Sequence, residues 1–193
     1  TGGMGTFSPS EIYTDELAKN IKENVLDKTL KGFQEDGLDF KGILFVGLMI
    51  TEDGPKVLEY NVRFGDPETQ SVLTLMESDL VELIEAALRE ELDKTTVKWK
   101  DGVCINVVLA SKGYPGNFTK GYEITIDEKV KDKVFLAGAK LEDDVLKTNG
   151  GRVLSVIGCG SNVQEARKEA YENIKYVNFK DSYCRKIGRA SCR

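Results

Sequence analysis

The segment VLEYNVRFGDPETQ, residues 57–70, carries side chains that could bind a metal ion and a phosphate. Side chains alternate across a β-strand, so Glu59, Asn61 and Arg63 are expected on one face. A carboxylate and an amide oxygen two residues apart suit Mg²⁺, which completes its shell with water and nucleotide phosphates. A guanidinium two residues further on can bind a phosphate or carboxylate through two hydrogen bonds. The set therefore suits phosphoryl transfer by charge neutralisation and positioning.

The same alternation is also typical of an ordinary hairpin strand with one dry and one wet face. In that interpretation Val57 lies on the polar face, and the opposite face is formed by Leu58, Tyr60, Val62 and Phe64. Asn is a poor strand former, however, and a solvated face more often carries Thr, Lys or Glu. Spacing alone therefore favours a metal and phosphate site and leaves the ordinary hairpin as an alternative.

The composition excludes several classes of function. The 193 residues are 40% hydrophobic and carry a net charge of -5, which argues against a general binder of nucleic acids or anionic membranes. The absence of histidine excludes a Ser-His triad and a His-ligated metal. No apolar run approaches the roughly 18 residues of a membrane span, and the first ten residues do not form a signal peptide. The four cysteines contain no CxxC pair, so we expect a reduced, cytoplasmic chain.

The hydrophobic periodicity predicts an α+β fold. We expect a helix from a cap at Ser10 to about Phe33, followed by a hairpin of two strands, an amphipathic helix, a polar boundary near residues 93–102, four short strands and a closing helix. Ser161 and Gln164 are the expected capping box of that closing helix. The predicted hairpin strands are 41–51 and 56–64, the amphipathic helix is 78–92, the later strands are 103–111, 122–126, 134–141 and 152–160, and the closing helix is 162–177.

Several longer strings resemble the family of glycinamide ribonucleotide synthetase, also called phosphoribosylamine–glycine ligase, within the ATP-grasp superfamily. They are TGGMGTFSP at the start, FKGILFVGLMITEDGPKVLEYNVRFGDPETQ around the hairpin, and VVLASKGYPGNFTKG, VFLAGAKL and TNGGRVLSVIG further on. The resemblance implies the C-terminal half of an ATP-grasp domain over residues 1–96. It also implies a small β-rich C-terminal domain with one closing helix over residues 97–185, which leaves 186–193 as a non-native tail.

The resemblance further implies a reaction and its metal. ATP would activate glycine to glycyl phosphate, and the amine of 5-phosphoribosylamine would attack it, giving glycinamide ribonucleotide, ADP and phosphate. Glu59 and Asn61 would hold Mg²⁺ or Mn²⁺ against the nucleotide phosphates. Arg63 would be the catalytic residue that neutralises developing negative charge.

The resemblance also implies which residues bind the substrates. The loop of Gly2, Gly3 and Gly5 would let the backbone approach an anion closely, although an ordinary flexible terminus is the alternative. Asp66 and Glu68 would lie at the glycine and phosphoribosylamine end of the site. Either carboxylate could instead cap the helix that follows.

Two departures from the family pattern qualify these expectations. The chain starts inside the glycine motif, so the preceding part of the same protein is the expected partner, and the chain alone is expected to be inactive and poorly stable. The last residues, KIGRASCR, look like a translated sequencing adapter, with a one-residue deletion in a natural tail as the alternative. Two other functions remain open: another ATP-grasp carbon–nitrogen ligase and a non-catalytic packing module. The string FGDPETQ argues against a biotin-dependent carboxylase.

Overall fold

The computed structural model describes residues 2–187, which separate into two compact units. Unit 1 contains the described residues up to Ser8, the segment Asp66–Leu75 and the described residues from Lys100 onward. Unit 2 contains Pro9–Gly65 and Met76–Trp99. The domain boundary expected between residues 96 and 97 lies close to Trp99, where the chain leaves unit 2 and enters unit 1. The sequence did not predict that the residues up to Ser8 and the segment Asp66–Leu75 would belong to unit 1.

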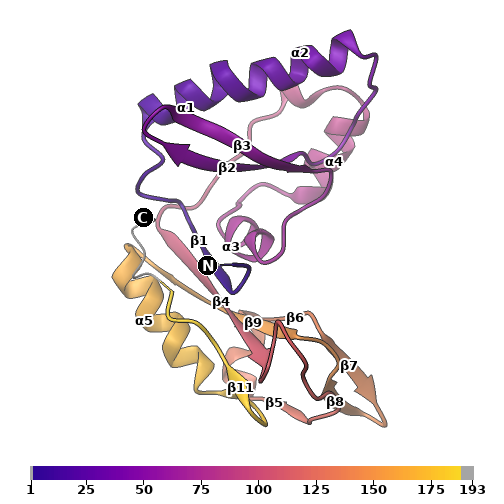
Figure 1. Cartoon of the computed structure of the whole chain (residues 1–193), viewed down its shortest axis with the longest axis vertical. Coiled ribbons are helices and arrows are strands. Elements are labelled where there is room, and N and C mark those ends of the chain that lie inside the picture. The colour runs from indigo at the N-terminus through magenta and orange to yellow at the C-terminus, as the bar shows by residue number, and fades with distance from the viewer. Residues whose placement is uncertain (1, 188–193) are drawn as a thin grey trace. The chain divides into compact units, whose positions relative to one another are not determined.

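Unit 1 is built on a five-stranded antiparallel sheet (Figure 1). Its order is β1-β4-β9-β6, and β11 also pairs with β4. The bounds are β1 Gly5–Ser8, β4 Val103–Ser111, β6 Val134–Leu136, β9 Arg152–Gly160 and β11 Ser182–Tyr183. The other elements of this unit are α3 Glu68–Thr74, β5 Ile124–Ile126, the 3-10 helix Glu128–Lys133, β7 Ala139–Glu142, β8 Val145–Thr148, α5 Val163–Ile174 and β10 Val177–Phe179.

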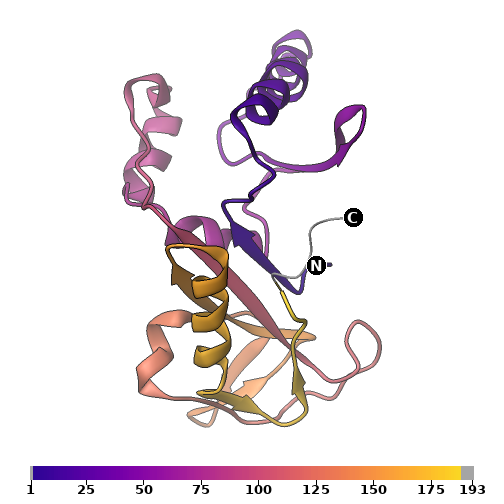
Figure 2. The same ribbon diagram turned by 90° about the vertical axis from the view of Figure 1, so that its left-hand side faces the viewer.

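The core of unit 1 lies around the two long central strands. β4 and β9 are almost continuously apolar and buried, as expected for strands that are covered on both faces. Helix α5 packs on them through Ala166 and Ala170, both fully buried (Figure 2). A Cβ at Gly158 of β9 would come within 2.1 Å of the backbone nitrogen of Ala170. Small residues on both partners therefore set the close approach of helix and sheet.

The start of α5 lies one residue later than predicted. Asn162, not Ser161, is the N-cap, and its side-chain oxygen accepts a hydrogen bond of 3.0 Å from the backbone nitrogen of Glu165. The Glu165 carboxylate accepts bonds from the hydroxyl and the backbone nitrogen of Ser161, which lower its pKa. The predicted Ser161–Gln164 box is therefore wrong by one position. Asn162 has the extended backbone of an N-cap, and its bond from the Glu165 nitrogen is one half of a capping box. The Glu165 carboxylate bonds the Ser161 nitrogen and not the Asn162 nitrogen, so the box is not reciprocal.

Unit 2 is a two-stranded antiparallel hairpin with a long helical segment against it. The hairpin strands are β2 Phe45–Thr51 and β3 Gly54–Asn61. The helical segment comprises α1 Asp15–Ile21, a π-helical turn Lys22–Leu26 and α2 Asp27–Glu35, and the unit also holds α4 Leu80–Leu88 and the 3-10 turn Leu92–Lys94. The first helix begins later than predicted, with Thr14 as its cap. The Ser10 prediction was wrong because the Ser10 carbonyl closes a turn with the Tyr13 nitrogen instead.

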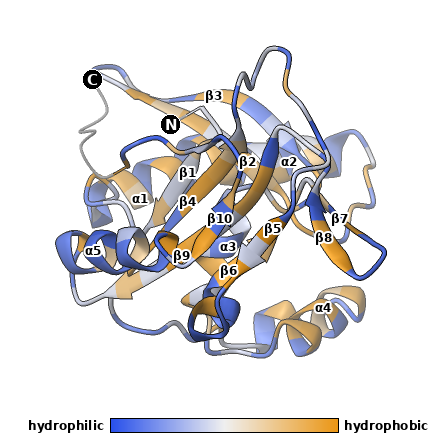
Figure 3. Cartoon of the chain, turned by 90° about the horizontal axis from the view of Figure 1, so that it is seen from below, coloured by the Kyte–Doolittle hydropathy of each residue, from blue (hydrophilic) through white to orange (hydrophobic). Residues whose placement is uncertain are grey.

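Unit 2 buries little apolar surface. Among residues 2–187, the only buried hydrophobic side chains assigned to it are Ile21, Val25 and Ala86. Large apolar side chains remain exposed on its hairpin and on α4, such as Leu58 at 62% and Leu88 at 63%, and Figure 3 shows hydrophobic residues along α4. None of the helices within residues 2–187 is long and apolar enough to cross a membrane.

Candidate metal and phosphate site

The register of the hairpin places Glu59 and Asn61 on the same face, as the alternation predicts. Asn61 pairs with Phe45 and Glu59 with Gly47, whereas Tyr60 pairs with Val46 between them. Residues directly opposite in a ladder share a face. The Tyr60 face is the one that meets the helical segment, since the Tyr60 hydroxyl lies 2.8 Å from the Thr29 hydroxyl of α2. Glu59 and Asn61 therefore project from the opposite side of the hairpin.

A bulge changes one face assignment. Gly47 pairs with Glu59 but the next residue, Leu48, pairs with Val57, so Leu58 is an extra residue in β3. Val57 is thereby moved to the face of Tyr60, and the prediction that it shares the face of Glu59 was wrong. Lys56, which pairs with Met49, takes the place of Val57 on the polar face. The alternation of the sequence continues unbroken through this bulge, so the pattern could not reveal it.

Gly47 makes room for the Glu59 side chain. A Cβ built at Gly47 would lie 2.9 Å from Cγ of Glu59 and 3.7 Å from its Oε1. Contacts below 3.0 Å are essentially never made by real Cβ atoms, so the Glu59 side chain lies directly over the glycine. An isolated glycine inside a strand often marks such a close approach. Gly47 is thus part of the site, although it was not among the site residues predicted from the sequence.

Arg63 contacts the amide group of Asn61. Its Nη2 donates to Oδ1 of Asn61 over 3.4 Å, and its Nη1 donates to the carbonyl oxygen of Phe64 over 2.8 Å. Arg63 lies beyond the end of β3, so its proximity to Asn61 comes from the side chain and not from strand alternation. An exposed guanidinium, an amide oxygen and a neighbouring carboxylate are therefore gathered at the end of one strand.

This donor set fits a hard cation that takes only a few protein ligands. Within residues 2–187 no group of three or more His, Cys, Asp or Glu side chains could hold a metal ion. Glu59 and Asn61 supply one carboxylate and one amide oxygen from adjacent positions on the same face. Mg²⁺ is commonly bound by one or two carboxylates together with substrate phosphates and water. The two residues thus suit Mg²⁺ or Mn²⁺ and do not suit a metal enclosed by protein ligands.

The glycine motif of residues 2–5 belongs to unit 1 and begins its sheet. Gly2 and Gly3 have φ values of 60° and 71°, which form a tight turn that favours glycine. Gly5 is the first residue of β1 and pairs with Val107. A Cβ at Gly5 would lie 2.6 Å from the carbonyl oxygen of Asn106 and even closer to Ile187. The strand β1 was not predicted, because a short glycine-rich terminus gains its order from pairing with β4 and not from its own propensity.

Asp66 and Glu68, also in unit 1, have different surroundings. The Asp66 carboxylate forms an ion pair with Arg152, with 3.0 Å between Oδ2 and Nη2, and accepts a 2.9 Å bond from Gln70. Glu68 is the first residue of α3 and is half-buried. In the described part of the chain its carboxylate has no hydrogen bond or ion pair. The N-cap position of α3 is Pro67, which makes no side-chain capping bond, so neither carboxylate is the cap of this helix.

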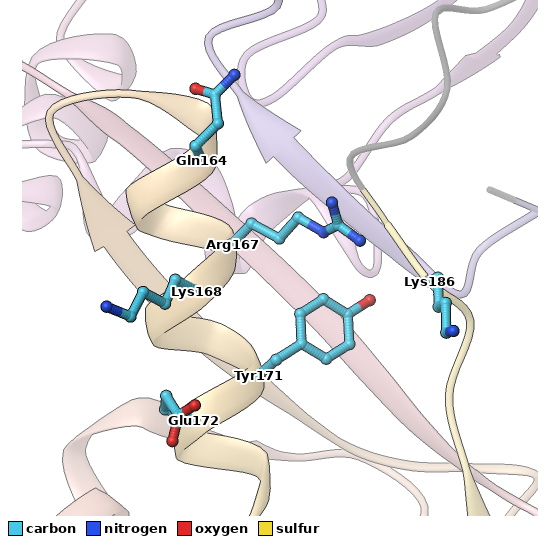
Figure 4. Close-up of a pocket in the computed structure, with 6 residues that line it drawn as sticks. All are labelled: Gln164, Arg167, Lys168, Tyr171, Glu172 and Lys186. Atoms are coloured by element: carbon cyan, nitrogen blue, oxygen red, sulfur yellow. The ribbon is translucent and has the colours of Figure 1, made fainter.

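A separate cavity lies along α5 in unit 1. It has a volume of about 410 Å³, and Figure 4 shows Arg167 and Tyr171 reaching from the helix toward the segment after β11 that carries Lys186. The Tyr171 hydroxyl donates to the carbonyl oxygen of Arg185 and accepts from the backbone nitrogen of Ile187, and burial raises its pKa. The lining residues are Gln164, Arg167, Lys168, Tyr171, Glu172 and Lys186. None of the eight predicted site residues lines this cavity.

The predicted tail is described only at its start. Ile187 is 2% exposed and packs against Ile105 and Val107 of β4 and against α5. Cys192 and Arg193 lie outside the described residues. The proposal that residues 186–193 are non-native stays a prediction.

The fold of the chain is of the ATP-grasp class. Two family models match the chain: the ATP-grasp (A) domain of phosphoribosylglycinamide synthetase over residues 1–69, and the C domain of the same protein over residues 104–190. The chain belongs to the phosphoribosylglycinamide synthetase family. The fold class expected from the sequence is thereby confirmed.

Several similar proteins are named as phosphoribosylamine–glycine ligases or as purine biosynthetic proteins. A phosphoribosylamine–glycine ligase of Clostridium acetobutylicum is 51% identical over 98% of this chain and 46% of its own length. The ligase of Escherichia coli K12 is 44% identical over 96% of this chain and 44% of its own length. A trifunctional purine biosynthetic protein adenosine-3 of Gallus gallus is 45% identical over 96% of this chain and 19% of its own length. The chain thus spans less than half the length of each of these relatives.

Solved structures agree with this assignment. A phosphoribosylamine–glycine ligase of Thermotoga maritima matches with a TM-score of 0.86 and 40% identity, over 96% of this chain and 46% of that one. The urea carboxylase of Kluyveromyces lactis matches with a TM-score of 0.65 at 15% identity, over 94% of this chain and 16% of that one. At that identity the second match shows a shared fold alone.

Proposed function

We propose that this chain is part of a longer ligase that joins glycine to 5-phosphoribosylamine in purine synthesis. ATP phosphorylates the glycine carboxylate, giving glycyl phosphate and ADP. The amine of 5-phosphoribosylamine attacks the glycyl carbonyl carbon, and phosphate leaves as glycinamide ribonucleotide forms. The two family models and the names of the relatives support this proposal. ATP, glycine and 5-phosphoribosylamine are the proposed substrates, and the upstream part of the same protein is the proposed partner, in the cytoplasm.

The observation that carries the proposal is the shared face of Glu59 and Asn61 with Arg63 in contact. Glu59 and Asn61 would hold Mg²⁺ or Mn²⁺, which when bound supplies positive charge to the nucleotide phosphates. Gly47 leaves the Glu59 side chain free to lie flat over β2. Arg63 would neutralise negative charge that develops as the phosphoryl group is transferred and as phosphate leaves. One of its nitrogens already bonds Asn61, so its charge lies at the same strand end.

For the substrates, we propose the turn at Gly2 and Gly3 together with Glu68. The tight glycine turn leaves its backbone accessible to an anionic group, and Gly5 supports the turn by starting β1. The half-buried Glu68 carboxylate can accept hydrogen bonds from an amine such as that of glycine or phosphoribosylamine. The Asp66 carboxylate already forms an ion pair with Arg152 and accepts a hydrogen bond from Gln70. Of the two acidic residues, Glu68 is therefore the better candidate for direct substrate contact.

The test is Glu59→Gln in the longer protein, measured as ADP formation that depends on glycine and phosphoribosylamine. Removing the charge that holds the cation should lower kcat by about 10²-fold or more, because this interaction acts chiefly in the transition state. Glu52→Gln, in the exposed turn of the same hairpin, is the matched control and should retain turnover. Near-normal turnover of Glu59→Gln at all Mg²⁺ concentrations would refute the ligand role. Glycine-dependent ADP formation by the 193-residue chain alone would refute the need for an upstream part.

A further inference from the structure

Arg152, the first residue of β9, contacts two segments that are far from it in the sequence. Its Nη1 donates to the carbonyl oxygen of Gly3 over 3.1 Å and to the carbonyl oxygen of Asp66 over 2.9 Å. Its Nη2 forms the 3.0 Å ion pair with the Asp66 carboxylate. All three residues belong to unit 1. We call Arg152, Gly3 and Asp66 the Arg152 cluster.

The residue after Asp66 is held by further bonds from the same sheet. The carbonyl oxygen of Pro67 accepts from Nδ2 of Asn106 over 3.0 Å and from the hydroxyl of Thr6 over 2.9 Å. Asn106 is fully buried in β4, and Thr6 lies in β1. These bonds attach the turn of Asp66 and Pro67 to β1 and β4, while Arg152 attaches it to β9. The chain passes from unit 2 into unit 1 at this turn.

The charges and acceptors around Arg152 argue against a direct role on a substrate anion. Its side chain is 29% exposed, and its positive charge is offset by a carboxylate 3.0 Å away. Its Nη1 donates to two main-chain carbonyl oxygens of the protein. A guanidinium presents several donors in a rigid plane, so it can join a main-chain carbonyl, a second carbonyl and a carboxylate at once. Lysine has no such planar arrangement.

We propose that Arg152 is a positioning residue that orders the glycine turn and the Asp66–Pro67 turn relative to each other. Through this order it sets the direction of Glu68, which follows Pro67 directly. The effect on substrates rests on the proposed function, since Glu68 and the glycine turn are its proposed substrate contacts. The order of the two turns does not rest on it and can be measured in the 193-residue chain itself.

The first test measures amide hydrogen exchange of residues 2–5 and 66–70 in the chain. Arg152→Ala removes charge-assisted hydrogen bonds to both turns, so exchange in both should become about tenfold faster or more. Arg152→Lys keeps the charge without the planar donors and should give an intermediate rate. Asp66→Asn combined with Arg152→Ala should add little to Arg152→Ala alone, since both changes remove the same ion pair. Arg167→Ala, an arginine of α5 outside the cluster, is the control and should leave both turns unchanged.

The second test uses the longer protein and separates positioning from direct contact. Arg152→Ala should lower kcat/KM for phosphoribosylamine or glycine about tenfold or more while the KM for ATP changes less than about twofold. Glu68→Gln should give a similar kinetic loss with normal amide exchange. An unchanged exchange rate at either turn in Arg152→Ala would refute the claim that Arg152 orders both turns. Faster exchange with unchanged kinetics would overturn the positioning role. Absence of ligation in the unsubstituted longer protein would instead refute the proposed function and leave the exchange result standing.

Discussion

Replacing Gly47 by alanine tests whether the position of the Glu59 carboxylate decides metal binding. The new methyl group would lie 2.9 Å from Cγ of Glu59, whereas ordinary contacts are 3.4–4 Å, so Glu59 must move by about 0.5 Å or more. Functional groups usually have to be held within about 0.5 Å of their productive position, and a misplacement of about 1 Å can cost about 10²-fold. We therefore expect a loss of metal-dependent turnover of about ten- to a hundredfold in Gly47→Ala.

The assay combines Mn²⁺ binding, measured by electron paramagnetic resonance with ATP present, and ADP formation in the longer protein. Gly32→Ala is the matched control, since a Cβ at Gly32 of α2 meets nothing within 4 Å. That control should stabilise its helix by about 0.5–1 kcal/mol without changing metal binding. Gly47→Ala should alter the free energy of unfolding far less than it alters turnover. Unchanged Mn²⁺ affinity and turnover in Gly47→Ala would refute the reasoning.

Three further predictions concern the stability of the chain. Burial raises the pKa of the Cys104 thiol from 9.0 to about 12, so the unfolded state loses this proton at a lower pH than the folded state does. The free energy of unfolding should therefore fall between about pH 9 and 12, with a slope of at most about 1.4 kcal/mol per pH unit. Urea unfolding should show this slope in the unsubstituted chain and lack it in Cys104→Ala. Ile187→Ala should cost about 2–5 kcal/mol because the side chain is buried, whereas the exposed Leu141→Ala should change little, and equal effects would show that the start of the predicted tail is not packed. Limited proteolysis should cut residues 9–65 and 76–99 first, because unit 2 buries few apolar side chains; equal resistance of both units would contradict this.

The hairpin shows how much of the site could be predicted from the sequence. Period-two alternation correctly placed Glu59 and Asn61 on one face of the strand, because no bulge separates these two residues. It misplaced Val57, because a bulge at Leu58 is decided by cross-strand pairing and leaves no break in the pattern. Gly47 could have been found, since a lone glycine in an otherwise apolar strand is a known sign of close approach.

The Arg152 cluster shows what could not be predicted. Arg152 was visible only as one residue of the string TNGGRVLSVIG. Its partner Asp66 lies 86 residues earlier, and Gly3 lies 149 residues earlier. No local periodicity or propensity links such positions, because the contacts arise only when β9 joins the sheet. Spacing suggested Glu59, Asn61 and Arg63, and the family resemblance suggested the other site residues. Neither showed that the site residues belong to two separate units.

The interleaved arrangement of unit 1 has a consequence for synthesis on the ribosome. The strand β1, Gly5–Ser8, is made well before its partner β4, which begins only at Val103. The edge of β1 therefore stays unpaired while nearly a hundred residues are added, and an unpaired strand edge is a site for wrong association with other chains. The glycine turn before β1 and the shortness of this strand limit that hazard, since a four-residue strand offers few backbone groups to a wrong partner. The strand β1 precedes every other strand of its sheet in the chain, yet it can become ordered only after β4 has been made.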